Sequence, residues 1–276
     1  MTAPTILITG CSSGIGYHCA HALKKRSWRV FASCRSQVDC ERLAAEGLES
    51  ARLDYCDQAS IAAAVDGVLK ATDGRLDALF NNGAYANPGA SEDLATEHLR
   101  RLIETNFIGW YDLTRRVVPV MRSQGSGRIV NCSSILGFLG VRFAGAYVAS
   151  KFAVEGWTDT LRLELKGTGI HVSLIEPGPI ESRMLDNARD RFMRTIDVKR
   201  SPFRHEYARE YSRISSGSRS SRFKLGPDAV LAKLVHALEN PRPRARYRVT
   251  VPTHVGAWLK RLLPTAALDR VLLRQR

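Results

Sequence analysis

The chain has 276 residues, 44% of them hydrophobic and 25% charged, and carries a formal net charge of +14. This composition excludes an intrinsically disordered chain, and its length suits one large α/β domain or two small ones. Because no secretory signal is visible and no apolar run approaches the ~18 residues that span a bilayer, a cytoplasmic protein is expected.

Short apolar runs alternate with longer amphipathic stretches over the first 180 residues. The runs predict strands at 5–9, 29–34, 50–54, 76–81, 128–133 and 171–176, and the stretches predict helices near 14–26, 38–46, 58–72, 95–123 and 150–166. Nearly continuous apolar strands that alternate with helices are typical of a parallel sheet covered on both faces. The sequence therefore predicts an α/β, doubly wound, Rossmann-like sheet, completed by a helix near 228–239 and a strand near 246–251.

A glycine-rich turn, Thr9-Gly-Cys-Ser-Ser-Gly-Ile-Gly16, follows the first strand and opens the first helix. Glycine allows a tight turn and a close approach to a pyrophosphate, and the helix that follows offers free N–H groups and a positive dipole end. Alone, the glycines at 10, 14 and 16 are also compatible with an ordinary tight turn. Their place at the start of an α/β pattern favours dinucleotide binding.

The second strand ends at Cys34 and is followed by Arg35, where proteins that bind NAD usually carry an acid for the ribose 2′-hydroxyl. No carboxylate is present there to repel a 2′-phosphate, and a guanidinium is available to pair with it. Ser12 and Ser13 can add hydroxyl donors. We therefore expect NADP(H), with NAD(H) less favoured; the alternative is that Arg35 is an ordinary exposed cation.

Tyr147 and Lys151 are four residues apart at the start of a predicted helix and so share one face. An ammonium beside a phenol favours the phenolate and lowers the tyrosine pKa from about 10, which suits acid/base chemistry near neutral pH. Ser133 and Ser134 close the fifth strand on the same side of the sheet. These side chains are the candidate catalytic group.

The motifs together form an ordered set over residues 5 to about 182 that resembles the short-chain dehydrogenase/reductase family. They comprise TGxxxGIG at 9–16, Asp54 after the third strand, a near match to NNAG at 81–84, Asn106, Ser134, the Tyr147/Lys151 pair and Pro177-Gly178. The spacing between Ser134 and Tyr147 is that of the family and selects Ser134 over Ser133. Within the family, residues 8–16, 149–156 and 173–178 resemble the 17β-hydroxysteroid and retinol dehydrogenase-like branch and its bacterial relatives.

The resemblance implies a catalytic role for four residues. Tyr147 would exchange a proton with the substrate oxygen, while Lys151 lowers the tyrosine pKa and binds the nicotinamide ribose. Ser134 would donate a hydrogen bond to the reacting oxygen, and Asn106 would hold a water that links Lys151 to solvent.

The resemblance also completes the expected cofactor site. Asp54 would meet the adenine, Asn82 the adenosine-side ribose and the backbone of Ile180 the carboxamide. The sequence departs from the family pattern in two places: Gly83-Ala84 replaces alanine-glycine, and Ser182 replaces threonine. The expected cofactor-binding residues are Gly10, Ser12, Ser13, Gly14, Ile15, Gly16, Arg35, Asp54, Asn82, Tyr147, Lys151, Pro177, Gly178, Ile180 and Ser182.

Six cysteines, none in a C-x-x-C pair, and seven histidines without H-E-x-x-H predict reduced buried thiols and no metal site. The basic charge is uneven. Residues 1–182 carry 19 basic and 19 acidic side chains, whereas residues 183–276 carry 22 and 8. The net charge therefore belongs to the C-terminal third, where it bears on partners rather than on fold.

Residues 183–225 are rich in Arg and Ser and show little periodicity, so an irregular insertion is expected there. We expect it to cover the substrate, since an insertion after the sixth strand lies at the ligand-binding edge of the sheet; a solvated loop is the alternative. Its apolar residues could line a pocket for a lipophilic substrate such as a steroid, retinoid or fatty aldehyde, or could pack the loop onto the domain. They are Met184, Leu185, Phe192, Met193, Ile196, Phe203, Tyr207, Tyr211 and Phe223.

Residues 255–276 form a basic amphipathic extension with two apolar stripes. The first is Trp258, Leu259, Leu262 and Leu263, and the second is Leu268, Val271 and Leu272. The favoured interpretation is packing on the domain or on a partner subunit near the substrate entrance. The alternative is peripheral contact with an anionic membrane.

The favoured function is a single dinucleotide-binding catalytic domain, residues 1–276, that interconverts a carbonyl and an alcohol. A non-catalytic, dinucleotide-binding regulatory member of the family is the alternative, although the intact set of Asn106, Ser134, Tyr147 and Lys151 argues against it. Nucleic-acid binding by the basic third ranks last, because no recognised module is present, and no nucleic-acid partner is expected. The resemblance further implies a homodimer or homotetramer that pairs the helices near 95–123 and 150–166.

Overall fold

The computed structural model describes residues 3–215 and 223–274 and contains a parallel sheet of seven strands in the order β3-β2-β1-β4-β5-β6-β7. This confirms the predicted fold. The strands are β1 (Thr5–Thr9), β2 (Arg29–Cys34), β3 (Glu49–Arg52), β4 (Ala78–Asn81), β5 (Gly127–Cys132), β6 (Ile170–Glu176) and β7 (Arg246–Arg248). The last strand is shorter than expected, because a helix already begins at Val251.

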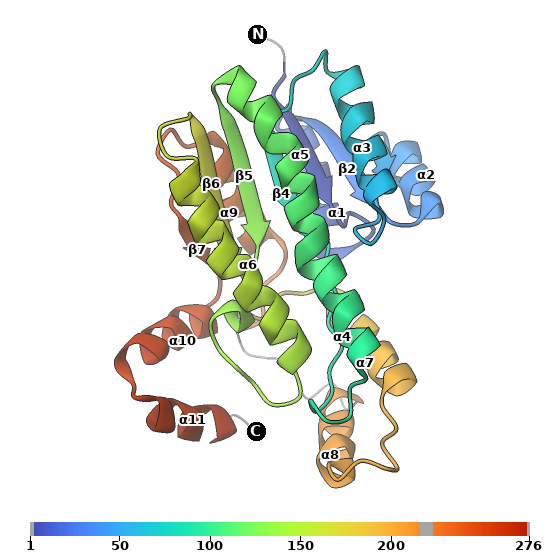
Figure 1. Cartoon of the computed structure of the whole chain (residues 1–276), viewed down its shortest axis with the longest axis vertical. Coiled ribbons are helices and arrows are strands. Elements are labelled where there is room, and N and C mark those ends of the chain that lie inside the picture. The colour runs from blue at the N-terminus through green and yellow to red at the C-terminus, as the bar shows by residue number, and fades with distance from the viewer. Residues whose placement is uncertain (1–2, 216–222, 275–276) are drawn as a thin grey trace.

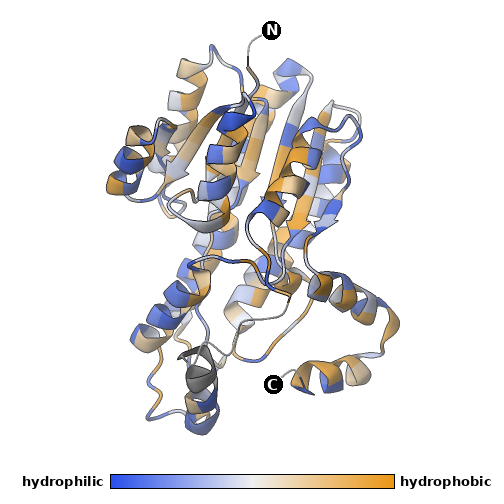
Figure 2. Ribbon diagram, turned by 180° about the vertical axis from the view of Figure 1, so that it is seen from behind, coloured by the Kyte–Doolittle hydropathy of each residue, from blue (hydrophilic) through white to orange (hydrophobic). Residues whose placement is uncertain are grey.

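Helices cover both faces of the sheet (Figure 1). One layer contains α3 (Gln58–Ala71), α5 (Gly109–Gln124) and α6 (Gly145–Glu164); α1 (Gly14–Lys25) and α9 (Asp228–Glu239) pack together on the other face, and α2 (Gln37–Ala45) packs on β2 and β3. The strands between the two layers consist largely of hydrophobic residues, as the orange parts of the ribbon show (Figure 2). Each residue of β1 is buried, as expected for a central strand of a parallel sheet.

The predicted helix at 95–123 is interrupted. It consists of α4 (Thr96–Ile103), a five-residue π-helical segment (Glu104–Ile108) and α5. A single π-helical turn is rare and occurs often at functional sites. No propensity rule separates it from α-helix, so the sequence did not reveal it.

The segment 183–225 corrects the expectation of an irregular insertion. It contains α7 (Met184–Thr195) and α8 (Arg204–Ser215), which lie below the carboxyl ends of the strands in Figure 1. Arginines and acidic residues dominate both helices. In α7, the buried Ala188 and the buried Ile196, which directly follows the helix, are spaced as on one helical face.

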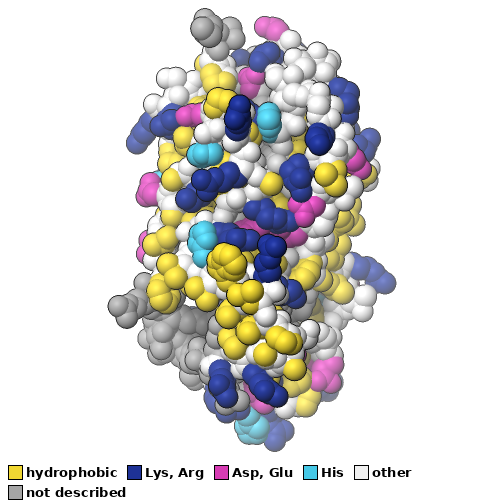
Figure 3. Space-filling model, turned by 90° about the vertical axis from the view of Figure 1, so that its left-hand side faces the viewer, with side chains coloured by type: hydrophobic (Ala, Val, Ile, Leu, Met, Phe, Trp, Pro, Cys, Tyr) yellow, Lys and Arg dark blue, Asp and Glu magenta, His cyan; other side chains and the backbone are white. Residues whose placement is uncertain are grey.

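Two more helices, α10 (Val251–Leu262) and α11 (Thr265–Arg274), lie at the same end of the molecule as α7 and α8. Figure 3 looks onto the side that carries α10 and shows hydrophobic side chains gathered in its lower half beside Lys and Arg. Of the helices in the described part of the chain, none is long and apolar enough to cross a membrane.

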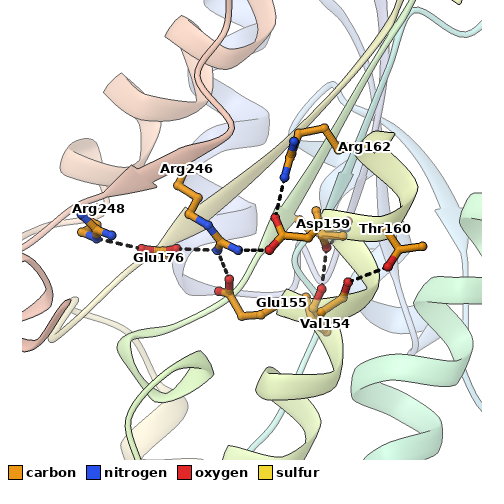
Figure 4. A network of polar contacts seen from close by, with 11 residues as sticks. Val154, Glu155, Asp159, Thr160, Arg162, Glu176, Arg246 and Arg248 are labelled. Carbon is orange, nitrogen blue, oxygen red and sulfur yellow. Dashed lines mark hydrogen bonds and ion pairs between the residues drawn. The ribbon is translucent and has the colours of Figure 1, made fainter. Parts of the chain in front are cut away.

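A charged network fixes α6 against the edge of the sheet (Figure 4). Arg246 on β7 pairs with Glu155 and Asp159 on α6, and also with Glu176 on β6 at 2.9 Å. Arg248 reaches the other oxygen of Glu176 at 3.3 Å. The network therefore joins the last two strands to the helix that carries Tyr147 and Lys151.

Burial raises the pKa of Glu155 to about 7, and the nearby charge of Glu176 acts in the same direction against the pairing with Arg246. This value lies above the usual pKa of about 4.5. Between these two pH values, the folded protein therefore keeps the Glu155 proton that the unfolded chain has already released. The contribution of Glu155 therefore favours folding least above pH 7.

Glu155→Gln should flatten the pH dependence of stability. In the unmodified protein, the free energy of unfolding should fall between pH 5 and pH 8 by on the order of 1–3 kcal/mol through this carboxyl, and the amide cannot titrate. Urea unfolding at pH 5, 6.5 and 8 measures the slope. Asp159→Asn is the control. Partial burial raises the pKa of Asp159, but Arg162 and Arg246 outweigh it and lower the pKa below its usual value, so Asp159 stays charged from pH 5 to pH 8. Equal slopes for Glu155→Gln and the unmodified protein would contradict this account.

Candidate functional site

The Thr9 hydroxyl joins three strand ends at the carboxyl edge of the sheet. It donates to the carbonyl of Phe80 at 3.2 Å and accepts from the N–H of Asn82 at 2.9 Å. It also accepts the hydroxyl proton of Tyr55 at 2.6 Å, in the loop after β3. Since Thr9 is fully buried, these bonds fix the loops that follow β1, β3 and β4 relative to one another.

The glycine turn is packed too tightly for side chains. A Cβ at position 16 would lie 2.5 Å from the carbonyl oxygen of Gly10 and 2.7 Å from Nδ2 of Asn82. Gly10 and Gly14 have φ of +69° and +60°, a region that favours glycine. The sequence TGxxxGIG thus lets the backbone of the turn pass directly beside the loop after β4.

The first helix presents its N-terminus at this turn. The residue before it, Ser13, makes no capping hydrogen bond, and the first turn contains no acidic side chain. The free N–H groups and the positive end of the helix dipole are therefore available to an anion. These residues fit the pyrophosphate of a dinucleotide.

Arg35 is exposed directly after β2, beside the buried Cys34. The backbone carbonyl of Arg35 accepts from Nε of Arg52 at 3.3 Å. The side chain of Arg35 lies at the surface. Ser12 is exposed in the glycine turn, and its carbonyl accepts from Arg42 at 2.8 Å. The end of β2 and the glycine turn thus form one positively charged edge.

Two further expected cofactor residues support loops. The Asp54 carboxylate accepts the N–H of Cys56 at 3.0 Å, and the backbone N–H of Asp54 donates to the hydroxyl of Ser60 at 3.0 Å. The Asn82 amide donates to the carbonyl of Thr9 at 3.0 Å, so in this structure Asn82 braces the glycine turn.

Tyr147 and Lys151 share one face of α6 and are both buried, with 7% and 1% of their surface exposed. The Lys151 ammonium donates to the carbonyl of Cys132 at 2.8 Å and lies 4.5 Å from the centre of the Trp110 ring. Burial lowers the pKa of Lys151 to about 8, although Cys132 and Glu155 act in the opposite direction. The side chain is held rigidly at the end of β5.

The expected lowering of the Tyr147 pKa is not seen. Burial raises it, the neighbouring thiol of Cys132 adds to the effect, and a hydrogen bond with Ser134 only partly offsets them. Lys151 lies 5.7 Å from the centre of the tyrosine ring and directs its ammonium to a backbone carbonyl. Sequence spacing gave the shared face correctly but could not give the burial of both groups.

Ser134 lies in the cavity described below, whereas the buried Ser133 is not among its lining residues. The hydroxyl of Ser134 accepts the N–H of Leu136 at 3.1 Å and so begins a short 3₁₀ turn, Ile135–Gly137. The family spacing that selected Ser134 agrees with this placement.

Asn106 lies within the π-helical segment and is fully buried. Its amide bonds both the N–H and the carbonyl of Tyr85, at 3.0 and 2.8 Å, and donates to the hydroxyl of Ser150 at 3.2 Å. Asn106 therefore joins the loop after β4 to α6 at Ser150, the residue that precedes Lys151. Its expected role towards a water stays a prediction.

The segment after β6 crosses the same edge. The carbonyl of Pro177 accepts from Ile135, and Gly178 lines the cavity. The N–H of Leu225 donates to the carbonyl of Pro179, and the carbonyl of Leu225 accepts the N–H of Glu181. Leu225 therefore leaves the backbone groups of Ile180 unbonded, and within residues 3–215 and 223–274 they are available to a ligand. Ser182 follows, 3.1 Å from the point that a Cβ on Gly14 would occupy.

A cavity of about 800 Å³ adjoins these residues. Ser134 and Tyr147 form part of its wall, together with the segment 141–144, α7, Tyr207 on α8 and α11. Much of the wall is apolar, with arginines at positions 142, 189 and 209. Its lining residues are Ala86, Pro88, Gly89, Ser134, Ile135, Leu136, Val141, Arg142, Phe143, Ala144, Tyr147, Gly178, Met184, Leu185, Ala188, Arg189, Phe192, Glu206, Tyr207, Arg209, Leu272 and Leu273.

The apolar residues of 183–225 divide between the two roles foreseen for them. Met184, Leu185, Phe192 and Tyr207 line the cavity, whereas Ile196 and Phe203 pack in a small core with Ala90 and Phe143. Met193 and Phe223 are exposed, and the side chain of Tyr211 lies outside the described residues.

Sequence reasoning missed the residues that fix α8. The hydroxyl of Tyr207 donates to Asp93 at 2.6 Å and accepts the N–H of Ala90 at 2.7 Å. Ser201 donates to the same carboxylate of Asp93 at 2.7 Å. These partners lie over a hundred positions apart, so only the fold brings them together.

The sheet topology, the glycine turn and the free helix N-terminus define a dinucleotide-binding protein of the Rossmann type. The family model described as short chain dehydrogenase matches residues 4–192. The chain therefore belongs to the short-chain dehydrogenase/reductase family, which confirms the resemblance and makes the protein an oxidoreductase that uses a nicotinamide dinucleotide.

Three comparisons illustrate the likeness. The chain is 38% identical to the uncharacterized oxidoreductase YbbO of Escherichia coli, over 97% of this chain and 93% of that protein. It is 33% identical to human 17-beta-hydroxysteroid dehydrogenase type 1, over 91% and 78%. The crystal structure of an actinorhodin polyketide ketoreductase variant with NADPH superposes with a TM-score of 0.74 at 31% identity, over 91% of this chain and 97% of that one.

Gly16→Ala should disrupt the glycine turn. The added Cβ would meet the backbone carbonyl of Gly10, which cannot move aside as a side chain can, and the Asn82 amide that braces the turn. We therefore expect a loss of roughly 1–3 kcal/mol of stability and a large loss of affinity for the dinucleotide. Gly67→Ala in the exposed middle of α3 is the control; its Cβ meets nothing within 4 Å, and helix propensity predicts a gain of up to about 1 kcal/mol. Denaturant unfolding and fluorescence titration with NADPH measure both. Unchanged NADPH binding in Gly16→Ala would show that the turn is not the cofactor site.

Proposed function

We propose that this protein is an NADP(H)-dependent oxidoreductase that interconverts a carbonyl and an alcohol on a lipophilic substrate. The observation that carries the proposal is the meeting of Tyr147 and Ser134 in the wall of a largely apolar cavity, with Lys151 buried one helical turn away. Asn106, Ser134, Tyr147 and Lys151 form the proposed catalytic group.

Ser134 and Tyr147 would hold the substrate oxygen between their hydroxyl groups. Because burial raises the Tyr147 pKa, its hydroxyl keeps its proton at neutral pH and can donate it to a carbonyl oxygen that gains negative charge. Ser134 would stabilise the same charge by a hydrogen bond. A bound nicotinamide supplies or accepts the hydride.

Lys151 would bind the nicotinamide ribose and place positive charge behind the tyrosine. At neutral pH its pKa of about 8 leaves most of the side chains charged. Asn106 fixes the loop after β4 through Tyr85 and, by its bond to Ser150, the helix that holds both catalytic side chains.

The dinucleotide would lie along the carboxyl edge of the sheet. Gly10, Ser12, Ser13, Gly14, Ile15 and Gly16 would hold the pyrophosphate, with Asp54 and Asn82 towards the adenosine and Pro177, Gly178, Ile180 and Ser182 towards the nicotinamide. Preference for NADP(H) over NAD(H) rests on Arg35, which is exposed after β2 with no carboxylate at the strand end. The ketoreductase that resembles this chain was crystallised with NADPH.

The cavity and the elements around it support a lipophilic substrate, and we propose that residues 183–225 cover it. Phe143, Phe192 and Tyr207 form one aromatic cluster, with ring centroids about 5 Å apart. The named activity of the human relative, on a hydroxysteroid, is compatible with such a pocket. The regulatory alternative does not require two hydroxyl groups that converge in a cavity.

We also propose a homodimer or homotetramer. Ile108, Tyr111, Phe152 and Leu163 expose apolar surface on the π-helical segment, α5 and α6, and a two-fold axis would bury such a face against its copy. Light scattering at micromolar concentration tests this proposal.

For the C-terminal extension, residues 255–276, we propose a role as cap of the cavity. Leu268 is buried, and Leu272 and Leu273 line the cavity, so the second apolar stripe packs against the protein. Trp258 and Leu262 of the first stripe remain exposed. Peripheral membrane contact is the alternative, and sedimentation with anionic liposomes tests it.

Tyr147→Phe should abolish turnover, by a factor of about 10²–10⁴ or more, and leave NADPH binding nearly unchanged, because the change removes one hydroxyl and no packing. Lys151→Ala should reduce both, since it removes the ammonium and the ribose contact. A panel of carbonyls and alcohols, followed by absorbance of the reduced nicotinamide, measures turnover. Substantial activity in Tyr147→Phe would mean that another group carries the proton.

Arg35→Asp should reverse the cofactor preference. The guanidinium pairs with a 2′-phosphate, whereas a carboxylate repels it and accepts a hydrogen bond from a 2′-hydroxyl. We expect kcat/KM to be higher with NADPH in the unmodified protein and with NADH in the variant. Equal efficiency with both cofactors in the unmodified protein would refute the NADP(H) assignment.

A further inference from the structure

Arg191 on α7 is a half-buried cation that pairs with no carboxylate in residues 3–215 and 223–274. Its guanidinium carbon lies 4.0 Å from the centre of the Tyr85 ring. Its Nε is buried and has no hydrogen-bond partner in this part of the chain. Buried charged donors are costly when unpaired, so such a donor marks a candidate position for an anion.

The charges of other cations reach it. Burial lowers the pKa of Arg191, and the positive charges of Arg35, Arg194 and Arg101 lower it further, with only Tyr85 acting the other way. These guanidinium groups come from the end of β2, from α4 and from α7. Like charges from separate elements repel each other, so an anion bound among them would stabilise the arrangement.

The course of α7 brings Arg191 to this place. The helix starts beside Gly14, through Ser182, and at its other end Thr195 donates to the side chain of Asn87 at 3.0 Å. Ala188 and Phe192 line the substrate cavity, and Arg191 does not. Arg191 therefore lies next to the cavity-lining residues of α7 without lining the cavity itself, and the charge of Arg35 acts on it.

The position of Tyr85 is itself fixed. Both its N–H and its carbonyl bond to Asn106, and its ring holds the guanidinium of Arg191 by a cation–π contact. The Nε of Arg191 has no hydrogen-bond partner in the described part of the chain, and a guanidinium can donate paired hydrogen bonds to a phosphate.

We propose that Arg191 is a second guanidinium for the 2′-phosphate of NADP(H), supplied by the helix that also walls the substrate cavity. The inference rests on the proposed NADP(H) preference. Arg35 binds the phosphate from the sheet and Arg191 from α7. NAD(H) carries a hydroxyl at this position and gains little from Arg191, so the residue determines specificity rather than general affinity.

The test measures binding alone and needs no substrate. Arg191→Ala and Arg191→Lys are titrated with NADP⁺, NAD⁺, adenosine 2′,5′-bisphosphate and adenosine 5′-monophosphate by calorimetry. We expect Arg191→Ala to weaken NADP⁺ and the bisphosphate by about ten- to a hundred-fold, the range for charge-assisted hydrogen bonds, and NAD⁺ and the monophosphate less than about three-fold. Arg191→Lys, which keeps the charge but not the fork, should fall between.

Arg200→Ala is the matched control, because it removes an exposed arginine that pairs with Asp197 just after α7; it should change neither cofactor. Thermal unfolding verifies that each variant is folded. An equal loss of affinity for NADP⁺ and NAD⁺ would place Arg191 on the shared pyrophosphate and overturn the proposal. Unchanged affinity for both cofactors would also overturn it. If the unmodified protein itself binds both equally, the NADP(H) assignment fails, which is a different result.

Discussion

The site depends on one buried hydroxyl, that of Thr9. Its hydrogen bonds to Tyr55, Phe80 and Asn82 fix the loops after β1, β3 and β4 next to one another at the carboxyl edge of the sheet. Only with those loops in place can the glycine turn pass directly beside Gly83 and leave the N-terminus of α1 open. A parallel sheet brings its carboxyl ends together, and Thr9 converts that general property into a particular surface.

Desolvation sets the chemistry of the groups around this edge. Lys151 is nearly inaccessible, and burial lowers its pKa to about 8; the carbonyl of Cys132 and the ring of Trp110 contact the ammonium. Tyr147 responds in the opposite sense and keeps its proton. In the proposed function, the pair would thus supply a proton donor and a cation fixed behind it, an arrangement suited to a substrate oxygen that becomes negative.

The sequence predicted the sheet, the glycine turn and the helix face that Tyr147 and Lys151 share, because each has a strong local signal: continuous apolar runs, clustered glycines and helical spacing. It did not predict the π-helical segment around Asn106 or the helices α7 and α8. In the second case the signal existed, since Leu185, Ala188, Phe192 and Ile196 are spaced at three and four positions, but numerous arginines obscured it. The direction of the Tyr147 pKa required the burial of both catalytic side chains, which spacing alone cannot supply.

The walls of the cavity explain why the substrate is the least predictable part of this protein. They come from the segment 141–144, from α7 and α8, and from Leu272 and Leu273 at the far end of the chain. Such elements are fixed by a few long-range bonds, as Tyr207 is by Asp93, and not by the periodic burial that defines the sheet. Their sequence can therefore change with little cost to the fold. Family membership then determines the type of reaction, an oxidation or reduction with a nicotinamide dinucleotide, while these separate segments shape the cavity beside Tyr147.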